Sequence, residues 1–237
     1  MKAIASFAVL VLLLLGLPHM GGWFHAWQPE LSHPLYTRTS FLALTLAHLG
    51  LVVAATSVAI AVGLGLGIVA TRPAGRSLLP TVRAVAVIGQ TVPPVAVLAI
   101  AVPLLGFGAA PTLLALALYG VLPVLGQTVA GLDQVSPAAL HAADGMGYGR
   151  WRRLLEVELP LAAGPIMAGV RLSAIVGVGT ATIGSAVGAT TLGSPIVEGL
   201  VGNNPAYVVQ GASLVGALAL SVDAALAAVE RRLRRQR

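Results

Sequence analysis

The chain has 237 residues, of which 57% are hydrophobic and 9% are charged, and its mean hydropathy is +0.91. Soluble domains carry about 25% charged residues, so this composition excludes a water-soluble globule and predicts a protein that lies in lipid. The net charge of +6 comes without a Lys/Arg stripe interleaved with aromatic residues, which argues against a nucleic-acid partner. The absence of cysteine excludes disulfides, thiolate catalysis and cysteine-based metal sites.

The first apolar run covers residues 3–17 and follows Lys2. It resembles the hydrophobic part of a signal peptide, but no small-x-small cleavage site comes after it, because the next residues are Pro18 and His19. We therefore expect a retained first helix, with cleavage as the alternative. A polar stretch over residues 28–40 follows.

Five further apolar segments follow, and a membrane span needs about 20 such residues. The third segment of the chain is interrupted by Pro93-Pro94 and by Pro103, and residues 190–205 are expected to form a loop. The sequence thus predicts an all-α, polytopic membrane helix bundle with about six transmembrane helices. The expected bounds of the last five are 41–70, 79–107, 111–130, 162–189 and 206–229.

The distribution of Lys and Arg predicts the orientation, because basic residues favour the cytoplasmic side of a membrane. With the amino terminus inside and six spans, thirteen of the fourteen basic residues fall in cytoplasmic segments and only Arg38 lies outside. We therefore expect cytoplasmic amino and carboxyl termini. The thirteen are Lys2, Arg72, Arg76, Arg83, Arg150, Arg152, Arg153, Arg171, Arg231, Arg232, Arg234, Arg235 and Arg237.

Residues 1–237 are expected to form a single transmembrane domain. Its parts are a first helix with an external loop (1–40), a core (41–230) that contains a cytoplasmic loop (131–160), and a basic cytoplasmic tail (231–237).

The loop over residues 131–160 is too polar to enter lipid. Ser136 followed by Pro137 is typical of a helix N-cap and first helical position, so residues 138–144 are expected to form about two helical turns. Glycines at 145, 147 and 149 should end this helix. A second short helix over residues 150–158 is expected to stop at Leu159-Pro160.

On the second short helix, apolar residues recur at spacings of three and four and predict a stripe along one face. The loop should therefore form a short helix–turn–helix element. One interpretation is a knob that fits a groove on a soluble partner, and the other is an amphipathic connector lying on lipid headgroups. The stripe consists of Trp151, Leu154, Leu155 and Glu158.

The same loop resembles the EAA loop of binding-protein-dependent ABC importers, whose pattern begins with Glu-Ala-Ala and ends with Ile-x-Leu-Pro. The chain has His141-Ala-Ala-Asp-Gly-Met-Gly147 and, after nine more residues, Val157-Glu-Leu-Pro160. His141 stands where the family has Glu, and Val157 replaces Ile. The resemblance implies contact with an ATPase through His141, Ala142, Ala143, Asp144, Gly145, Gly147, Trp151, Leu154, Leu155, Leu159 and Pro160.

Other segments are similar to permease subunits of osmoprotectant importers, the glycine betaine/carnitine/choline group. The likeness covers roughly residues 40–225 and lies in segments 89–94, 100–108, 118–123, 177–182 and 188–193. It implies the type I ABC importer (MetI-like) permease fold in a bacterial inner membrane. It also implies several partners: a cytoplasmic ABC ATPase dimer that binds ATP and Mg²⁺, a second permease subunit, either identical or different, and a separate extracytoplasmic substrate-binding protein.

The function implied is import of a compatible solute such as glycine betaine, choline or carnitine. The alternatives are import of another small solute, such as an amino acid or related amine, and secondary transport without ATP. The chain holds no Walker A sequence, so it is expected to bind no nucleotide or other cofactor and to be no enzyme by itself.

Polar side chains and freed backbone carbonyls at membrane depth must find partners or face a water-filled cavity. Residues of this kind are candidates for the translocation pathway, and the alternative role is hydrogen bonding between helices. The candidates are Gln90, Thr91, Pro93, Pro94, Thr180 and Thr182.

His48 and Asp223 are ionisable residues that lie in the predicted spans. His48 stands alone on an apolar helix and is expected to be a hydrogen-bonded packing residue. An acid inside a span is a functional candidate by default, but Asp223 could instead pair with Arg171 or lie near the headgroups.

Overall fold

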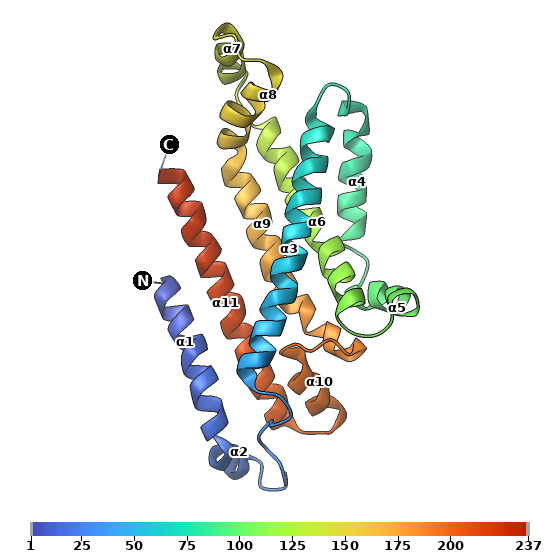
Figure 1. The fold of residues 1–237 in the computed structure, drawn as a ribbon, viewed down its shortest axis with the longest axis vertical. Coiled ribbons are helices and arrows are strands. Elements are labelled where there is room, and N and C mark those ends of the chain that lie inside the picture. The colour runs from blue at the N-terminus through green and yellow to red at the C-terminus, as the bar shows by residue number, and fades with distance from the viewer. Residues whose placement is uncertain (1, 236–237) are drawn as a thin grey trace.

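The computed structural model describes residues 2–235, and within these residues every regular element is helical (Figure 1). The helices are α1 (Lys2–Gly16), α2 (Gly21–Trp27), α3 (Phe41–Thr71), α4 (Leu79–Gly89), α5 (Pro94–Leu105), α6 (Ala109–Asp133), α7 (Pro137–Gly145), α8 (Arg150–Arg153), α9 (Leu159–Ala181), α10 (Gly193–Val201) and α11 (Pro205–Arg235). The predicted basic tail begins inside α11, and its residues 236–237 lie outside the described residues.

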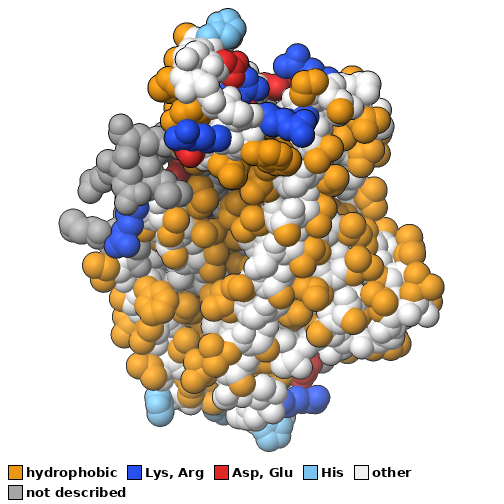
Figure 2. All heavy atoms as spheres, turned by 45° about the horizontal axis from the view of Figure 1, so that its top comes forward, with side chains coloured by type: hydrophobic (Ala, Val, Ile, Leu, Met, Phe, Trp, Pro, Cys, Tyr) orange, Lys and Arg blue, Asp and Glu red, His pale blue; other side chains and the backbone are white. Residues whose placement is uncertain are grey.

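Long helices run side by side and place α7 and α8 at one end of the bundle (Figure 1). The amino end of α1 and the carboxyl end of α11 point toward that same end, whereas α2 and α10 lie at the opposite one. Figure 2 shows hydrophobic side chains over the body and charged side chains gathered around the α7 end. This distribution is that of a bundle whose middle faces lipid.

The predicted number of about six spans is confirmed among the described residues. Four helices are long and apolar enough to cross a membrane, and two bent pairs bring the total to six if each pair is one span. The four are residues 41–71, 109–133, 150–181 and 205–232, and the bent pairs are α1–α2 and α4–α5.

The third predicted segment is a sharply broken helix. The helical stretch that ends at Gly89 and the one that begins at Pro94 meet at an angle of 94°. The cause is local, because Pro93 has no N–H to donate and its backbone is extended, with ψ at 135°. With 11 residues, α4 is about half the length that a bilayer requires.

The expected loop over residues 190–205 is wrong, because this segment contains the nine-residue helix α10. Pro195 lies in its first turn, where the missing N–H costs no helical hydrogen bond, and both Pro195 and Gly199 are buried. Gly199 lies so close to Val208 of α11 that an added Cβ would be 2.8 Å from that side chain. Packing on α11 therefore stabilises a helix in a segment rich in glycine and proline. The fifth span likewise ends early, at Ala181, before a 3₁₀ turn.

Helices α3, α6 and α9 pack closely against one another. A Cβ at Gly63 would lie 2.9 Å from the Val124 side chain, and one at Gly67 would lie 2.6 Å from Thr128. These glycines are four residues apart and share one face of α3. Gly169 brings α9 equally close to α6. Small residues thus allow the backbones to approach, as is usual between membrane helices.

Replacing Gly169 by alanine should destabilise the bundle. The new Cβ would lie 2.8 Å from the backbone oxygen of Pro123 and 3.1 Å from Cα of Val124. Neither atom can move alone, and overpacking of this kind costs about 1–3 kcal/mol. Thermal unfolding of the detergent-solubilised protein measures the effect. Gly179→Ala is the matched control on the same helix, because its Cβ meets no atom within 4 Å. Equal unfolding temperatures for the two variants would contradict this packing.

Asp223 and His48 both have partners in the structure. The Arg171 guanidinium of α9 binds the Asp223 carboxylate of α11, with Nε 2.5 Å from Oδ1 and Nη2 2.9 Å from Oδ2. Asp223 therefore pairs with Arg171, which was one of the two interpretations. His48 is fully buried and hydrogen-bonded to Val178 and Leu192, which confirms its predicted packing role.

Candidate coupling site

The projecting element, formed by α7 and α8 at one end of the bundle, begins with a capped helix. The Ser136 hydroxyl accepts a hydrogen bond from the Ala139 N–H at 3.3 Å, and Pro137 is the first residue of α7, as predicted. The helix ends in a Schellman motif, in which the Gly147 and Tyr148 N–H groups donate to carbonyls of the last turn. Gly147 has φ of +76°, a conformation that glycine adopts without steric cost. Both ends of α7 are thus defined by local sequence.

The second predicted helix does not stop at Leu159-Pro160. Residues 150–181 form one continuous helix, because a π-helical turn over Leu154–Glu158 joins α8 to α9. Proline inside a helix removes one hydrogen bond and its ring clashes with the carbonyl four residues before it. The wider π turn directly before Pro160 accommodates both effects. The projecting element is therefore rigidly continuous with a membrane-spanning helix.

The predicted apolar stripe divides between two faces. Leu154 and Glu158 are buried, with 3% and 5% of their surface exposed, whereas Trp151 and Leu155 are 65% and 62% exposed. Each pair is four residues apart and so shares a face. Most of the other predicted contact residues are also open to the surroundings: His141, Ala142, Asp144, Gly145 and Gly147 are exposed, Leu159 and Pro160 are half-buried, and Ala143 is buried. The exposed members form the outer surface of the element.

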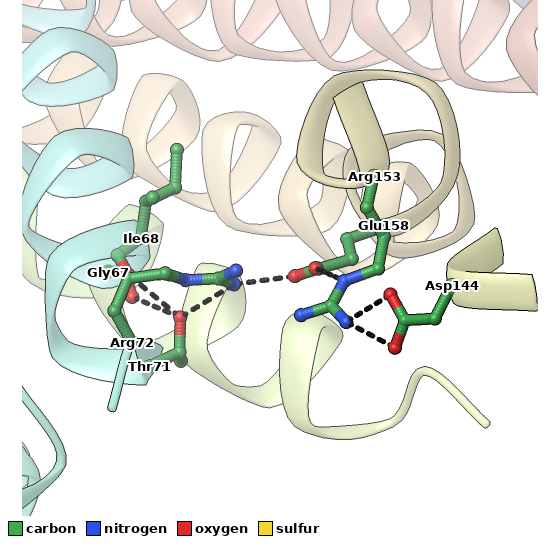
Figure 3. A network of polar contacts seen from close by, with 7 residues as sticks. All are labelled: Gly67, Ile68, Thr71, Arg72, Asp144, Arg153 and Glu158. Carbon is green, nitrogen blue, oxygen red and sulfur yellow. Dashed lines mark hydrogen bonds and ion pairs between the residues drawn. The ribbon is translucent and has the colours of Figure 1, made fainter. Parts of the chain in front are cut away.

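A chain of ion pairs fixes the element to the bundle (Figure 3). Arg153 of α8 binds both carboxylate oxygens of Asp144 through Nη1, at 2.7 and 2.8 Å. Its Nε donates to Glu158 Oε1 at 3.1 Å. Arg72, directly after α3, donates from Nη2 to Glu158 Oε2 at 2.6 Å. The chain of contacts therefore runs from α7 through α8 and the start of α9 to α3.

Sequence reasoning did not identify Arg72, Arg153 and Glu158 as a unit. Arg153 and Glu158 are five residues apart, which places them on different faces of an ordinary α-helix. The π turn closes hydrogen bonds between residues five apart and so brings these two side chains together. Arg72 is 86 positions from Glu158, and the only signal for it was an arginine at the end of a long apolar helix.

The pathway candidates do not gather at one place. Gln90 borders a groove of about 510 Å³ between α4 and α6, together with Arg83 and Gln127. Thr180 and Thr182 are not among the residues that line this groove. The Thr91 and Thr182 hydroxyls both donate to backbone carbonyls three residues earlier, which satisfies them within their own turns. Pro93 and Pro94 form the break between α4 and α5.

Comparisons with known proteins agree with this architecture. Residues 63–235 match the family of binding-protein-dependent transport system inner membrane components. The chain is 34% identical to the osmoprotectant import permease protein OsmY of Salmonella typhimurium, over 98% of this chain and 96% of that protein. It is 42% identical to the glycine betaine/carnitine/choline transport system permease protein OpuCB of Bacillus subtilis, over 61% of this chain and 66% of the relative.

The fold is similar to that of a solved transporter subunit. An inward-facing structure of the MetNI methionine ABC transporter aligns with a TM-score of 0.73 at 21% identity, over 81% of this chain and 95% of that one. The predicted type I ABC importer (MetI-like) permease fold is thereby confirmed. The family match, the relative that aligns over 98% of the chain and the fold all agree with one another. This chain belongs to the binding-protein-dependent transport system inner membrane components and is a multi-pass permease subunit of the inner membrane.

Proposed function

We propose that this chain is the membrane-spanning subunit of an ATP-binding-cassette importer for a compatible solute such as glycine betaine, choline or carnitine. The observation that carries the proposal is the similarity to an osmoprotectant import permease, which extends over 98% of the chain. The methionine transporter supports the fold alone, because it is only 21% identical.

The ATPase would bind the projecting element formed by α7 and α8. Two features support this site: its outer surface exposes Trp151 and Leu155, and its helix continues without a break into α9. A movement imposed on α7 and α8 would therefore move a whole membrane span. The bundle would alternate between outward-open and inward-open states, as packed helices do when they shift as rigid bodies.

The remaining partners and the orientation belong to the same proposal. A second permease subunit, a further copy of this chain or a different one, would complete the membrane part. An extracytoplasmic binding protein would deliver the solute, and ATP and Mg²⁺ would bind to the ATPase subunits. The α7 end would face the cytoplasm together with both termini, since charged side chains gather there (Figure 2).

Reconstitution in liposomes with the ATPase and the binding protein tests the proposal. Uptake of radiolabelled glycine betaine, choline or carnitine should require ATP and the binding protein. A competition panel that includes amino acids and related amines identifies the solute class, and competition by amino acids alone would contradict the assignment to compatible solutes. Uptake by the chain alone, without ATP, would show a secondary transporter instead.

A further inference from the structure

The carboxylate of Glu158 is the most enclosed member of the ion-pair chain. Only 6% of its side chain is exposed, compared with 28% for Arg153, 29% for Arg72 and 49% for Asp144. Its two oxygens have different partners, because Oε1 accepts from Arg153 and Oε2 from Arg72 (Figure 3). A buried carboxylate that loses a partner is strongly destabilised. Glu158 therefore holds both arginines in fixed positions.

The two oxygens of the Glu158 carboxylate connect different helices. On one side, Arg153 joins it to Asp144 of α7, so the projecting element is attached to this carboxylate. On the other side, Arg72 follows α3 directly and is itself held by a hydrogen bond from Nε to the Ile68 carbonyl at 3.3 Å. Helix α9 is connected to the α7–α8 element by continuous backbone. Helix α3 has no such connection, because Arg72 is 86 residues from Glu158 in sequence, and the ion pair between Arg72 and Glu158 links α3 to the element.

Below the ion pairs, α3 meets α9 through apolar contacts. Ile68 packs against a small buried cluster formed by Leu132, Leu154 and Ala162. Apolar contacts are non-directional, so they hold the helices together without fixing one polar atom to another. A charge-assisted hydrogen bond of 2.6 Å fixes a direction and a distance.

We propose that Glu158 is a positioning residue that transmits movement of the α7–α8 element to α3 through Arg72. ATPase closure would then displace two membrane helices, α9 through the continuous backbone and α3 through the ion pair. This inference rests on the proposed function, because it needs an ATPase bound at the element. Glu158 itself would contact neither the solute nor ATP.

The test is Glu158→Gln in the assembled importer, with ATP hydrolysis and solute uptake measured on the same proteoliposomes. The exposed outer surface of the element is unchanged, so hydrolysis should continue, while uptake falls because α3 no longer follows. The ATP consumed per solute transported should rise by about fivefold or more, the lower end of the range for coupled sites. A ratio equal to wild type would overturn the inference.

Glu156→Gln is the matched control. Glu156 is two residues away and 51% exposed, and among the described residues it pairs only with Arg152 on the same helix. Its loss should leave the ratio of ATP to solute unchanged. An equal rise in this control would show that any carboxylate of the element has the effect, which would also overturn the assignment to Glu158.

Arg72→Gln tests the same contact from α3 and leaves the Arg153–Glu158 pair in place. It should raise the ratio as Glu158→Gln does. The double variant should be no worse than Glu158→Gln alone, because that single variant already lacks the contact with Arg72. Parallel loss of hydrolysis and uptake in both single variants would indicate a merely structural role and overturn the inference. A wild-type importer without ATP-driven uptake would instead overturn the proposed function.

Discussion

Replacing Gly147 by tryptophan is expected to lower strongly the ATP hydrolysis that is coupled to transport in the assembled importer. A Cβ at Gly147 meets no atom of this chain within 4 Å, so a side chain at this position would clash with no neighbour at its Cβ in the isolated subunit. It would stand instead on the exposed surface where the ATPase is proposed to bind. Steric exclusion there should lower transport-coupled hydrolysis by roughly tenfold or more, which corresponds to a loss of about 1.4 kcal/mol in docking.

Backbone strain must be separated from bulk at this position, because Gly147 has φ of +76°. Gly147→Ala adds the strain of a left-handed residue, about 1–2 kcal/mol, without the bulk. Gly147→Asn adds little strain, since asparagine tolerates this conformation. We expect both variants to retain more coupled hydrolysis than Gly147→Trp. Wild-type hydrolysis and transport in Gly147→Trp would remove α7 and its following turn from the ATPase contact.

Replacing His48 by leucine is expected to lower the free energy of unfolding more than Gly169→Ala does. The ring joins three elements: Nδ1 accepts from the Leu192 N–H at 3.3 Å, and Nε2 lies 3.0 Å from the Val178 carbonyl oxygen. Because the backbone N–H can only donate, Nε2 carries the proton and donates to Val178. Leucine would leave one buried donor and one buried acceptor unpaired, at about 1–3 kcal/mol each.

Thermal unfolding of the detergent-solubilised protein measures this loss, and His48→Gln is the control. The glutamine amide offers one N–H donor and one oxygen acceptor, so it can pair with both backbone groups. Its unfolding temperature should therefore lie between those of wild type and His48→Leu. A leucine variant as stable as wild type would show that water or other groups satisfy Val178 and Leu192.

Composition and local sequence patterns were sufficient to predict the class of protein, the approximate spans and the ends of α7. Bilayer insertion depends on the length and apolarity of a segment, and both can be counted along the chain. The Ser136-Pro137 cap and the turn at Gly147 depend on residues only a few positions apart. The resemblance to importer permeases rested on such local patterns, and the family match confirms it.

Three features depend on tertiary packing and could not be predicted locally: the existence of α10, the continuation of α8 into α9, and the ion pairs around Glu158. Helix α10 forms against α11 despite glycine and proline in its sequence. Arg72 and Glu158 meet across 86 residues, and Arg171 and Asp223 across 52. Which charges pair inside a bundle depends on how helices are rotated and packed. That packing minimises unpaired polar groups over the whole chain, so no local pattern contains it.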